Sequence, residues 1–148
     1  MRKIPIAWIL QKKGSHVHTI RADRSVHEAI LMLVGLRVGS LVVTANDAVV
    51  GILTERDVLI ENARRFDRIA ETRVDQIMTR RVVFGSPEQT LDDVMHTMTE
   101  KRIRHLPILK DGELAGLISI GDVVKVQMEE ATHQIEHLSN YIASRYPA

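Results

Sequence analysis

The stretch that decides the fold of this chain is Gly-Leu-Ile-Ser-Ile-Gly-Asp at residues 116–122. A related stretch, Gly-Ile-Leu-Thr-Glu-Arg-Asp, occupies residues 51–57, which is 65 positions earlier. Both begin with glycine, run through apolar residues to a hydroxyl residue, and reach an aspartate three positions later. The same 65-residue spacing aligns the chain without a gap from residues 17 and 82 onward. A fixed period of this length indicates two copies of one supersecondary unit, each too small to bury a core alone.

The repeat divides the chain into four predicted parts. We expect a first repeat over residues 6–65, a charged connection over 66–73, a second repeat over 74–125 and a C-terminal helix over 126–146. Mixed charge as dense as that of the connection is usual for a solvated surface, so no chemistry is assigned to it.

The composition is that of an ordinary globular protein. Of the 148 residues, 45% are hydrophobic and 26% are charged, and the net charge is +1. Without a basic surface there is no reason to expect nucleic acid as a partner. The chain has no cysteine, which excludes disulfides and thiolate metal sites and fits a reducing compartment. No apolar run approaches the ~20 residues that span a bilayer, so we expect a cytoplasmic protein with no membrane partner.

Hydrophobic periodicity predicts the same order of elements in both repeats. In the first we expect a strand over 17–20, a helix capped by Ser25, strands over 41–43 and 49–53, and a helix over 54–65. In the second we expect a strand over 82–84, a helix capped by Thr90, strands over 106–109 and 114–118, and a following helix. Each repeat is therefore a β-α-β-β-α unit, and the predicted fold class is α/β (α+β).

A short helix or turn over residues 4–10 is expected before the first repeat, with its counterpart over 74–78. Here the spacing is 68 rather than 65, so the first copy carries about three extra residues, which we place within 12–16. This glycine-containing, basic stretch is predicted to be a loop. Because it lies just before a strand, it is also a candidate ligand-binding loop.

The C-terminal helix carries a feature that the first repeat lacks. Apolar residues step by four and three alternately, which is the seam of a coiled coil. These residues are Val124, Met128, Ala131, Ile135, Leu138 and Ile142. The seam could fold back on its own domain or meet its copy across a dimer. We favour the dimer, because the repeats already bury their own sheets.

These features together resemble a pair of cystathionine-β-synthase (CBS) domains. The segment Arg-Ile-Arg-His-Leu-Pro-Ile at residues 102–108 strengthens the resemblance, which covers about residues 6–125. The chain is most similar to small stand-alone bacterial and archaeal proteins built of one CBS pair. The resemblance implies two repeats packed sheet to sheet with pseudo-twofold symmetry, leaving two clefts between them.

The resemblance also implies a function. CBS pairs bind adenosine-containing ligands in these clefts, and we expect AMP, with ADP, ATP, NAD, NADH and S-adenosylmethionine as alternatives. The family role is regulatory sensing rather than catalysis, so we expect no catalytic cofactor and no enzyme activity. A homodimer of CBS pairs and a regulated partner protein are further expectations.

The chemistry of the repeated stretch suits a nucleotide. A hydroxyl residue between a strand and a helix places Ser119 and Thr54 at helix N-termini, where free N–H groups and the helix dipole favour a phosphate. An aspartate in the first turn, Asp122 or Asp57, is placed to accept hydrogen bonds from ribose hydroxyls, as acidic residues do in other nucleotide sites. The alternative is that these residues only cap their helices. The duplication, with the family resemblance, favours a ligand.

The resemblance assigns further residues to the two clefts. The first cleft, which we expect to bind more tightly, is lined by Ser119, Asp122, Val38, Gly39 and Ser40, with Lys12 and His16 of the inserted stretch beside it and Arg104 and His105 as phosphate contacts. The second cleft is lined by Thr54, Arg56, Asp57, Ile103, Arg104 and His105.

Two other chemistries fit poorly. His133 and His137 lie four apart on one helix face but have no third ligand nearby in sequence, so no metal site is expected. The residues around Ser119 are not the Gly-x-Ser-x-Gly elbow of a hydrolase. Two hypotheses remain: a nucleotide sensor that transmits a conformational change to a partner, and a ligand-independent oligomerisation or scaffold module that acts through its C-terminal helix.

Overall fold

The computed structural model describes residues 3–146, and within them lie six α-helices, one 3₁₀ helix and five strands. The first repeat contains β1 (Thr19–Arg21), α2 (Val26–Leu36), β2 (Ser40–Ala45), β3 (Ala48–Thr54) and α3 (Glu55–Arg65). The second contains α5 (Leu91–Lys101), β4 (His105–Lys110), β5 (Glu113–Ser119) and α6 (Ile120–Arg145). Before them lie α1 (Ile6–Lys13) and, after the 3₁₀ helix η1 (Phe66–Glu71), α4 (Val74–Ile77). The predicted α+β class is confirmed.

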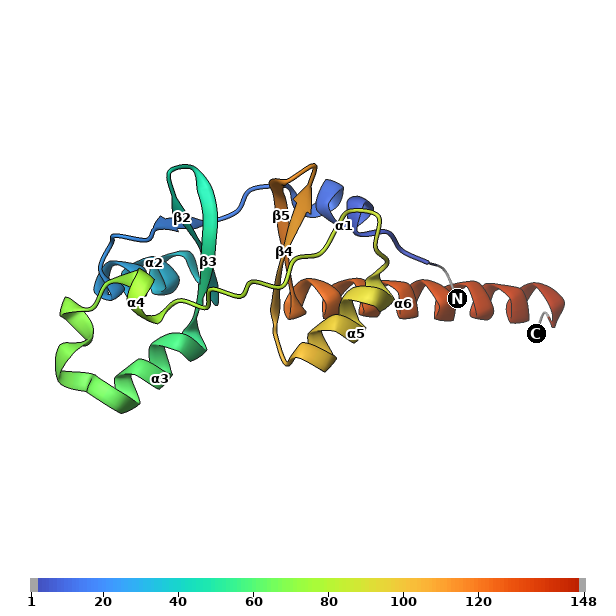
Figure 1. The fold of residues 1–148 in the computed structure, drawn as a ribbon. Helices are drawn as coiled ribbons and strands as arrows, with labels where there is room; N and C mark the ends of the chain where they lie inside the picture. The colour runs from blue at the N-terminus through green and yellow to red at the C-terminus, as the bar shows by residue number, and fades with distance from the viewer. Residues whose placement is uncertain (1–2, 147–148) are drawn as a thin grey trace.

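The repeats form two lobes, each with its own small sheet, and the sheets stand beside each other in the middle of the molecule (Figure 1). In the first sheet β1 runs parallel to β2, and β2 is antiparallel to β3. The second sheet is the antiparallel hairpin of β4 and β5. Both faces of the first sheet are covered: Leu41 and Val43 lie in a core cluster, while Val42 points to the opposite face and is also fully buried.

The strand expected over residues 82–84 is absent, and this prediction was wrong. Only one bridge, between Gly85 and Ile108, remains of it. In the first repeat the N–H of Val42 donates to the carbonyl of His18 and so begins the pairing of β1. The position 65 residues later is Pro107, which has no N–H to donate. The third strand of the second sheet is lost for this reason.

The helices begin where the sequence predicts. Ser25 caps α2 by accepting a hydrogen bond from the N–H of Glu28. Thr54, Thr90 and Ser119 each form a capping box with the aspartate three residues on, in which each side chain accepts from the other's backbone N–H. The aspartates are thus held in the first helical turn by local chemistry.

Each hydrophobic core is completed by the short helix that precedes the other repeat. Ile6, Ile9 and Leu10 from α1 lie in one cluster with residues of α5, β4, β5 and α6. Val74 and Met78, from α4 and its end, lie in the other cluster with residues of β1, α2, β2 and β3. The two segments that connect these helices to their own repeats therefore cross between the lobes (Figure 1).

The glycine of each repeated stretch makes room for this exchange. A Cβ on Gly116 would lie 2.5 Å from Cδ2 of Leu10, the residue of α1 that packs on β5. A Cβ on Gly51 would lie 2.6 Å from the sulfur of Met78. Real Cβ atoms do not approach this closely, so a side chain at either position would force the contacting residue to move. The glycines thus set the position of the residues that follow Leu10 and Met78.

The inserted stretch extends a helix at its start and is a loop after it, because residues 14–16 lie outside any helix or strand, as predicted. The helix expected to end at Leu10 continues through Lys12 and Lys13, which form the last turn of α1, so this part of the prediction was wrong. Basic residues are favourable in a last turn because they interact with the helix dipole. Gly14, with φ of 96°, ends the helix in the left-handed region that glycine favours.

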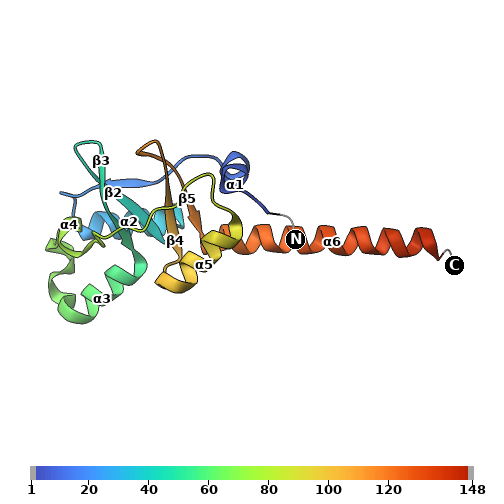
Figure 2. The ribbon, with the colours of Figure 1, turned by 45° about the vertical axis from the view of Figure 1, so that its right-hand side comes forward.

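The C-terminal helix α6 is continuous over 26 residues and extends beyond the rest of the molecule (Figures 1 and 2). Only its start is buried, through Val123 and Val126. The seam does not fold back on its own domain: Met128 is 66% exposed, Ile135 65% and Leu138 60%. An exposed apolar stripe of this length is unusual for a surface helix.

Candidate functional site

The first candidate site is built around the carboxylate of Asp122 at the start of α6. Its Oδ2 accepts hydrogen bonds from the backbone N–H of Ser119 at 2.8 Å and from the Ser119 hydroxyl at 2.9 Å. In return the N–H of Asp122 donates to the Ser119 oxygen at 3.3 Å. The hydroxyl and the carboxylate are therefore fixed in one orientation at a helix N-terminus.

A third donor reaches the same oxygen from the other end of the chain. The ammonium of Lys13 lies 2.5 Å from Oδ2 of Asp122 and donates to the carbonyl of Leu117 at 2.7 Å. The side chains of Lys13 and Asp122 are 33% and 22% exposed, so the pair is shielded from solvent only in part. Lys13 lies within the stretch 12–16 that is predicted as a candidate ligand-binding loop, but only Lys12 and His16 of that stretch are named as site residues.

A signal for Lys13 exists in the sequence. The three extra residues of the first copy are close to one helical turn, and Lys13 follows Leu10 by three positions, so the two share a helix face. Once Leu10 is known to pack over Gly116, Lys13 must lie one turn further along β5, near Asp122. That packing is a tertiary fact, which is why the sequence did not single out Lys13 within the stretch.

The charge state of Asp122 follows from these contacts. Partial burial raises the pKa of its carboxyl, but the hydrogen bond from Lys13 and those from Ser119 outweigh burial. The pKa of the Asp122 carboxyl therefore lies below its ordinary value, and the carboxylate is held ionised. An ionised carboxylate accepts hydrogen bonds and donates none, as a partner of ribose hydroxyls must.

His105 joins the two repeats. A Cβ on Gly39 would lie 2.9 Å from Nε2 of His105, so the imidazole of the second repeat rests against the backbone of the first. The carbonyl of Gly39 in turn accepts from the N–H of Glu55 at 3.0 Å. Burial lowers the pKa of His105, with Lys13 acting in the same direction and the carboxylates of Glu55 and Asp122 opposing it. The imidazole is therefore held neutral.

The second candidate site repeats the capping geometry with a different third donor. Oδ2 of Asp57 accepts from the N–H of Thr54 at 2.9 Å and from its hydroxyl at 3.1 Å. The hydroxyl of Thr79, which follows α4, donates to Oδ1 at 3.2 Å. Where Asp122 meets an ammonium, Asp57 meets a neutral hydroxyl.

The other predicted site residues are distributed as follows. Ser40 is buried at the start of β2, Val38 and Gly39 are half-buried beside it, and Arg56 and Arg104 are exposed. Lys12 is engaged elsewhere, with its ammonium 3.8 Å from Glu129 and over the ring of Trp8. His16 contacts the ring of His18 edge to face. The structure thus brings Gly39 and His105 together, and joins Ser119 and Asp122 to Lys13.

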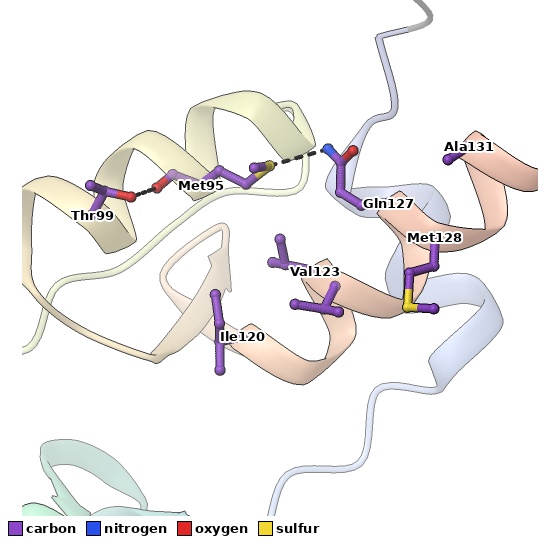
Figure 3. Close-up of a pocket in the computed structure, with 8 residues that line it drawn as sticks. Met95, Thr99, Ile120, Val123, Gln127, Met128 and Ala131 are labelled. Atoms are coloured by element: carbon purple, nitrogen blue, oxygen red, sulfur yellow. Dashed lines mark hydrogen bonds between the residues drawn. The ribbon is translucent and has the colours of Figure 1, made fainter.

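Two surface hollows lie apart from both aspartates, along α6. The larger, of about 470 Å³, is an apolar groove between α5 and α6 lined by Met95, Thr99, Ile120, Val123, Val124, Gln127, Met128 and Ala131. In Figure 3 the groove-lining side chains of α6 lie opposite α5, and the amide of Gln127 donates to the sulfur of Met95. In the part of the chain that the structure describes, no three His, Asp or Glu side chains are grouped as a metal ion requires.

Comparison with known proteins establishes the family. The model of the CBS domain matches this chain twice, over residues 14–63 and 74–129. The chain therefore belongs to the CBS domain family, and its two repeats are a CBS pair, as the sequence predicts.

Relatives with the same domain pair agree with this assignment. The mitochondrial CBS domain-containing protein CBSX3 of Arabidopsis thaliana is 35% identical over 129 residues, which are 84% of this chain and 63% of that protein. The crystal structure of the CBS-domain protein ATU1752 from Agrobacterium tumefaciens is 40% identical, with a TM-score of 0.81 over 83% of this chain and 92% of that one. The CBS pair of MJ0100, solved with 5-methylthioadenosine and S-adenosyl-L-methionine, shares the fold at 20% identity and a TM-score of 0.75, covering 87% of this chain and 99% of that one.

Among residues 3–146, no helix combines the length and the apolar character that a membrane span needs. The cytoplasmic location stays a prediction.

Proposed function

We propose that this chain is a regulatory module that binds an adenosine-containing ligand, AMP in the first place, at the Ser119–Asp122 site. The observation that carries the proposal is the pairing of the Asp122 carboxylate with the Lys13 ammonium at a helix N-terminus. Asp122 can accept the ribose hydroxyls, and Lys13 and the exposed Arg104 can meet a phosphate. The fold relative MJ0100, which holds two adenosine-containing ligands, supports this ligand class.

Such a ligand can act as a signal because the site joins both repeats. Lys13 comes from the helix before the first repeat, while Asp122 and His105 belong to the second, and His105 touches Gly39 of the first. A ligand that binds one arrangement of these elements better than another shifts the population towards it. A partner protein that contacts the module then reads the change.

Thermal unfolding of the purified protein tests this proposal, with AMP, ADP, ATP, NAD, NADH and S-adenosylmethionine each at millimolar concentration. A ligand bound only by the folded state stabilises it by about 2.7 kcal/mol at a hundredfold excess over its dissociation constant. We expect the largest increase in unfolding temperature with AMP, and no increase with AMP in the Asp122→Ala variant. If none of the six ligands shifts the midpoint, the proposal is wrong.

We propose as a second function that α6 assembles the module by pairing its exposed seam with that of a second copy. The seam positions Met128, Ile135 and Leu138 are each at least 60% exposed, and the apolar groove beside α5 continues their stripe. From Gln127 onward the positions that flank the seam are uncharged, namely Gln127, Thr132, Gln134, Ser139 and Tyr141, and the one charged flank, Lys125, lies beside Val124 at its start. Because these flanks are where like charges would repel in a pair of identical helices, their neutrality favours self-association.

Sedimentation at micromolar concentration tests the second proposal. We expect a dimer for the wild type and for His133→Glu, which adds a charge on the polar face, and a monomer for Leu138→Glu, which adds the same charge in the seam. AMP should leave this association unchanged, because the seam lies apart from the Asp122 site. A wild-type monomer at these concentrations contradicts the assembly role.

A further inference from the structure

The oxygen Oδ2 of Asp122 is fully used by the protein itself. It accepts from the N–H and hydroxyl of Ser119 and from the ammonium of Lys13. A carboxylate offers about four lone-pair sites over its two oxygens, or two on each. Three donors therefore saturate Oδ2. A pair of neighbouring ribose hydroxyls that uses both oxygens must displace one of them.

Lys13 is the donor that can leave. The two hydrogen bonds from Ser119 are part of the helix cap. Equivalent pairs of hydrogen bonds, from Thr54 to Asp57 and from Thr90 to Asp93, are found in the other two capping boxes. The Lys13 contact is additional to the cap, and it comes from a flexible side chain that is one third exposed. Its loss leaves the cap of α6 intact.

The structure points to Lys13 as a specificity-determining residue, and we propose that it selects phosphorylated nucleosides over neutral ones. This inference rests on the proposed nucleotide site. In the free protein Lys13 occupies the oxygen that the ribose needs, and an entering ligand displaces it. A neutral nucleoside leaves the displaced ammonium without its carboxylate partner, whereas the phosphate of AMP supplies a new anion for it. Lys13 thus opposes adenosine and favours AMP.

The test compares AMP with adenosine, which share ribose and base and differ only in the phosphate. Dissociation constants are measured by calorimetry for the wild type, Lys13→Met and Lys12→Met. Lys12→Met is the matched control, because it removes the same charge from the same helical turn while its ammonium lies near Glu129 rather than Asp122. We expect Lys13→Met to lower the preference for AMP over adenosine by about tenfold or more, as the loss of a hydrogen bond between charged groups implies. Lys12→Met should keep the wild-type preference.

The direction of each change carries the inference. Adenosine should bind Lys13→Met more tightly than the wild type, because its site is no longer occupied, and AMP should bind it more weakly. Lys13→Arg, which retains the charge, should restore the preference for AMP if Lys13→Met proves unstable. An unchanged ratio in Lys13→Met, with AMP still bound, overturns the role of Lys13 and leaves the proposed function standing. If the wild type binds neither ligand, the proposed function fails and this inference fails with it.

Discussion

The two repeats hold their aspartates in identical capping boxes and differ in what reaches each aspartate from outside. In the second repeat, Leu10 of α1 packs over Gly116, and Lys13, one turn further along, pairs with Asp122. The result is a carboxylate matched with a cation, three residues from a helix N-cap.

In the first repeat, Met78 packs over Gly51 in the same way, but the helix α4 has already ended at Ile77. Thr79, two residues after the end of α4, pairs with β3 in a β-bridge, and its hydroxyl donates to Asp57. The length of the short helix, eight residues in α1 and four in α4, thus decides whether an ammonium or a hydroxyl contacts the aspartate. One extra turn thus gives the two capping aspartates different electrostatic surroundings.

The largest effect should come from removing each aspartate in turn. Asp122→Ala should weaken AMP binding by about 100-fold, because hydrogen bonds to a charged group contribute about 1.5–3 kcal/mol. Asp57→Ala removes no contact from the proposed AMP site, so it should change the affinity for AMP by less than about threefold. Both variants lose the same half of a capping box, the hydrogen bonds from the N-cap residue to the aspartate, at a similar cost of ~1 kcal/mol, so each controls for the other's loss of stability. Calorimetric titration with AMP measures the difference, and equal losses would show that the two sites do not differ in affinity.

The next effect concerns the glycines that admit the short helices. Gly51→Ala should lower the free energy of unfolding by about 2 kcal/mol, because its Cβ would meet backbone as well as the Met78 side chain. The carbonyl oxygen of Thr79 would lie only 2.9 Å away. Gly116→Ala should cost about 1 kcal/mol or less, because its Cβ would meet only the end of the Leu10 side chain, which can rotate. Urea unfolding of both variants checks the order, which a larger cost at Gly116 would reverse.

The smallest effect is a pH dependence carried by the second repeat alone. His105 faces Glu55, Lys13, Arg104 and Asp122, and burial gives it a pKa below the ordinary value of about 6.5. The unfolded chain therefore binds a proton more readily than the folded one, and stability falls as the pH drops below about 6.5. His105→Gln should reduce this loss of stability. A substitution at Ser40, its counterpart in the first repeat, should leave the loss unchanged, because serine does not titrate in this range. Unfolding curves at pH 7.5 and 5.5 measure the slope, and an equal slope in His105→Gln would contradict this account.

Much of the fold could be predicted because its signals are local. The caps at Ser25, Thr54, Thr90 and Ser119 each depend on a residue three positions away, and every one of them forms. The sequence also contained a signal against the strand over 82–84, since Pro107 cannot donate the hydrogen bond that would begin its pairing. The prediction was wrong because it used apolar periodicity alone.

The amino-acid sequence by itself determined that the chain is a tandem repeat, that it is a CBS pair, and that Asp57 and Asp122 lie in the first turn of a helix. The repeat and the positions of the aspartates depend on spacing along the chain, and the family follows from the resemblance of the motifs at residues 51–57, 102–108 and 116–122. Only the tertiary structure decided that Lys13 meets Asp122, because the two are 109 positions apart. Their contact depends on a core in which α1 packs against the other repeat. Hydrophobic periodicity predicts a helix and its buried face, but it does not indicate which sheet that face will pack against.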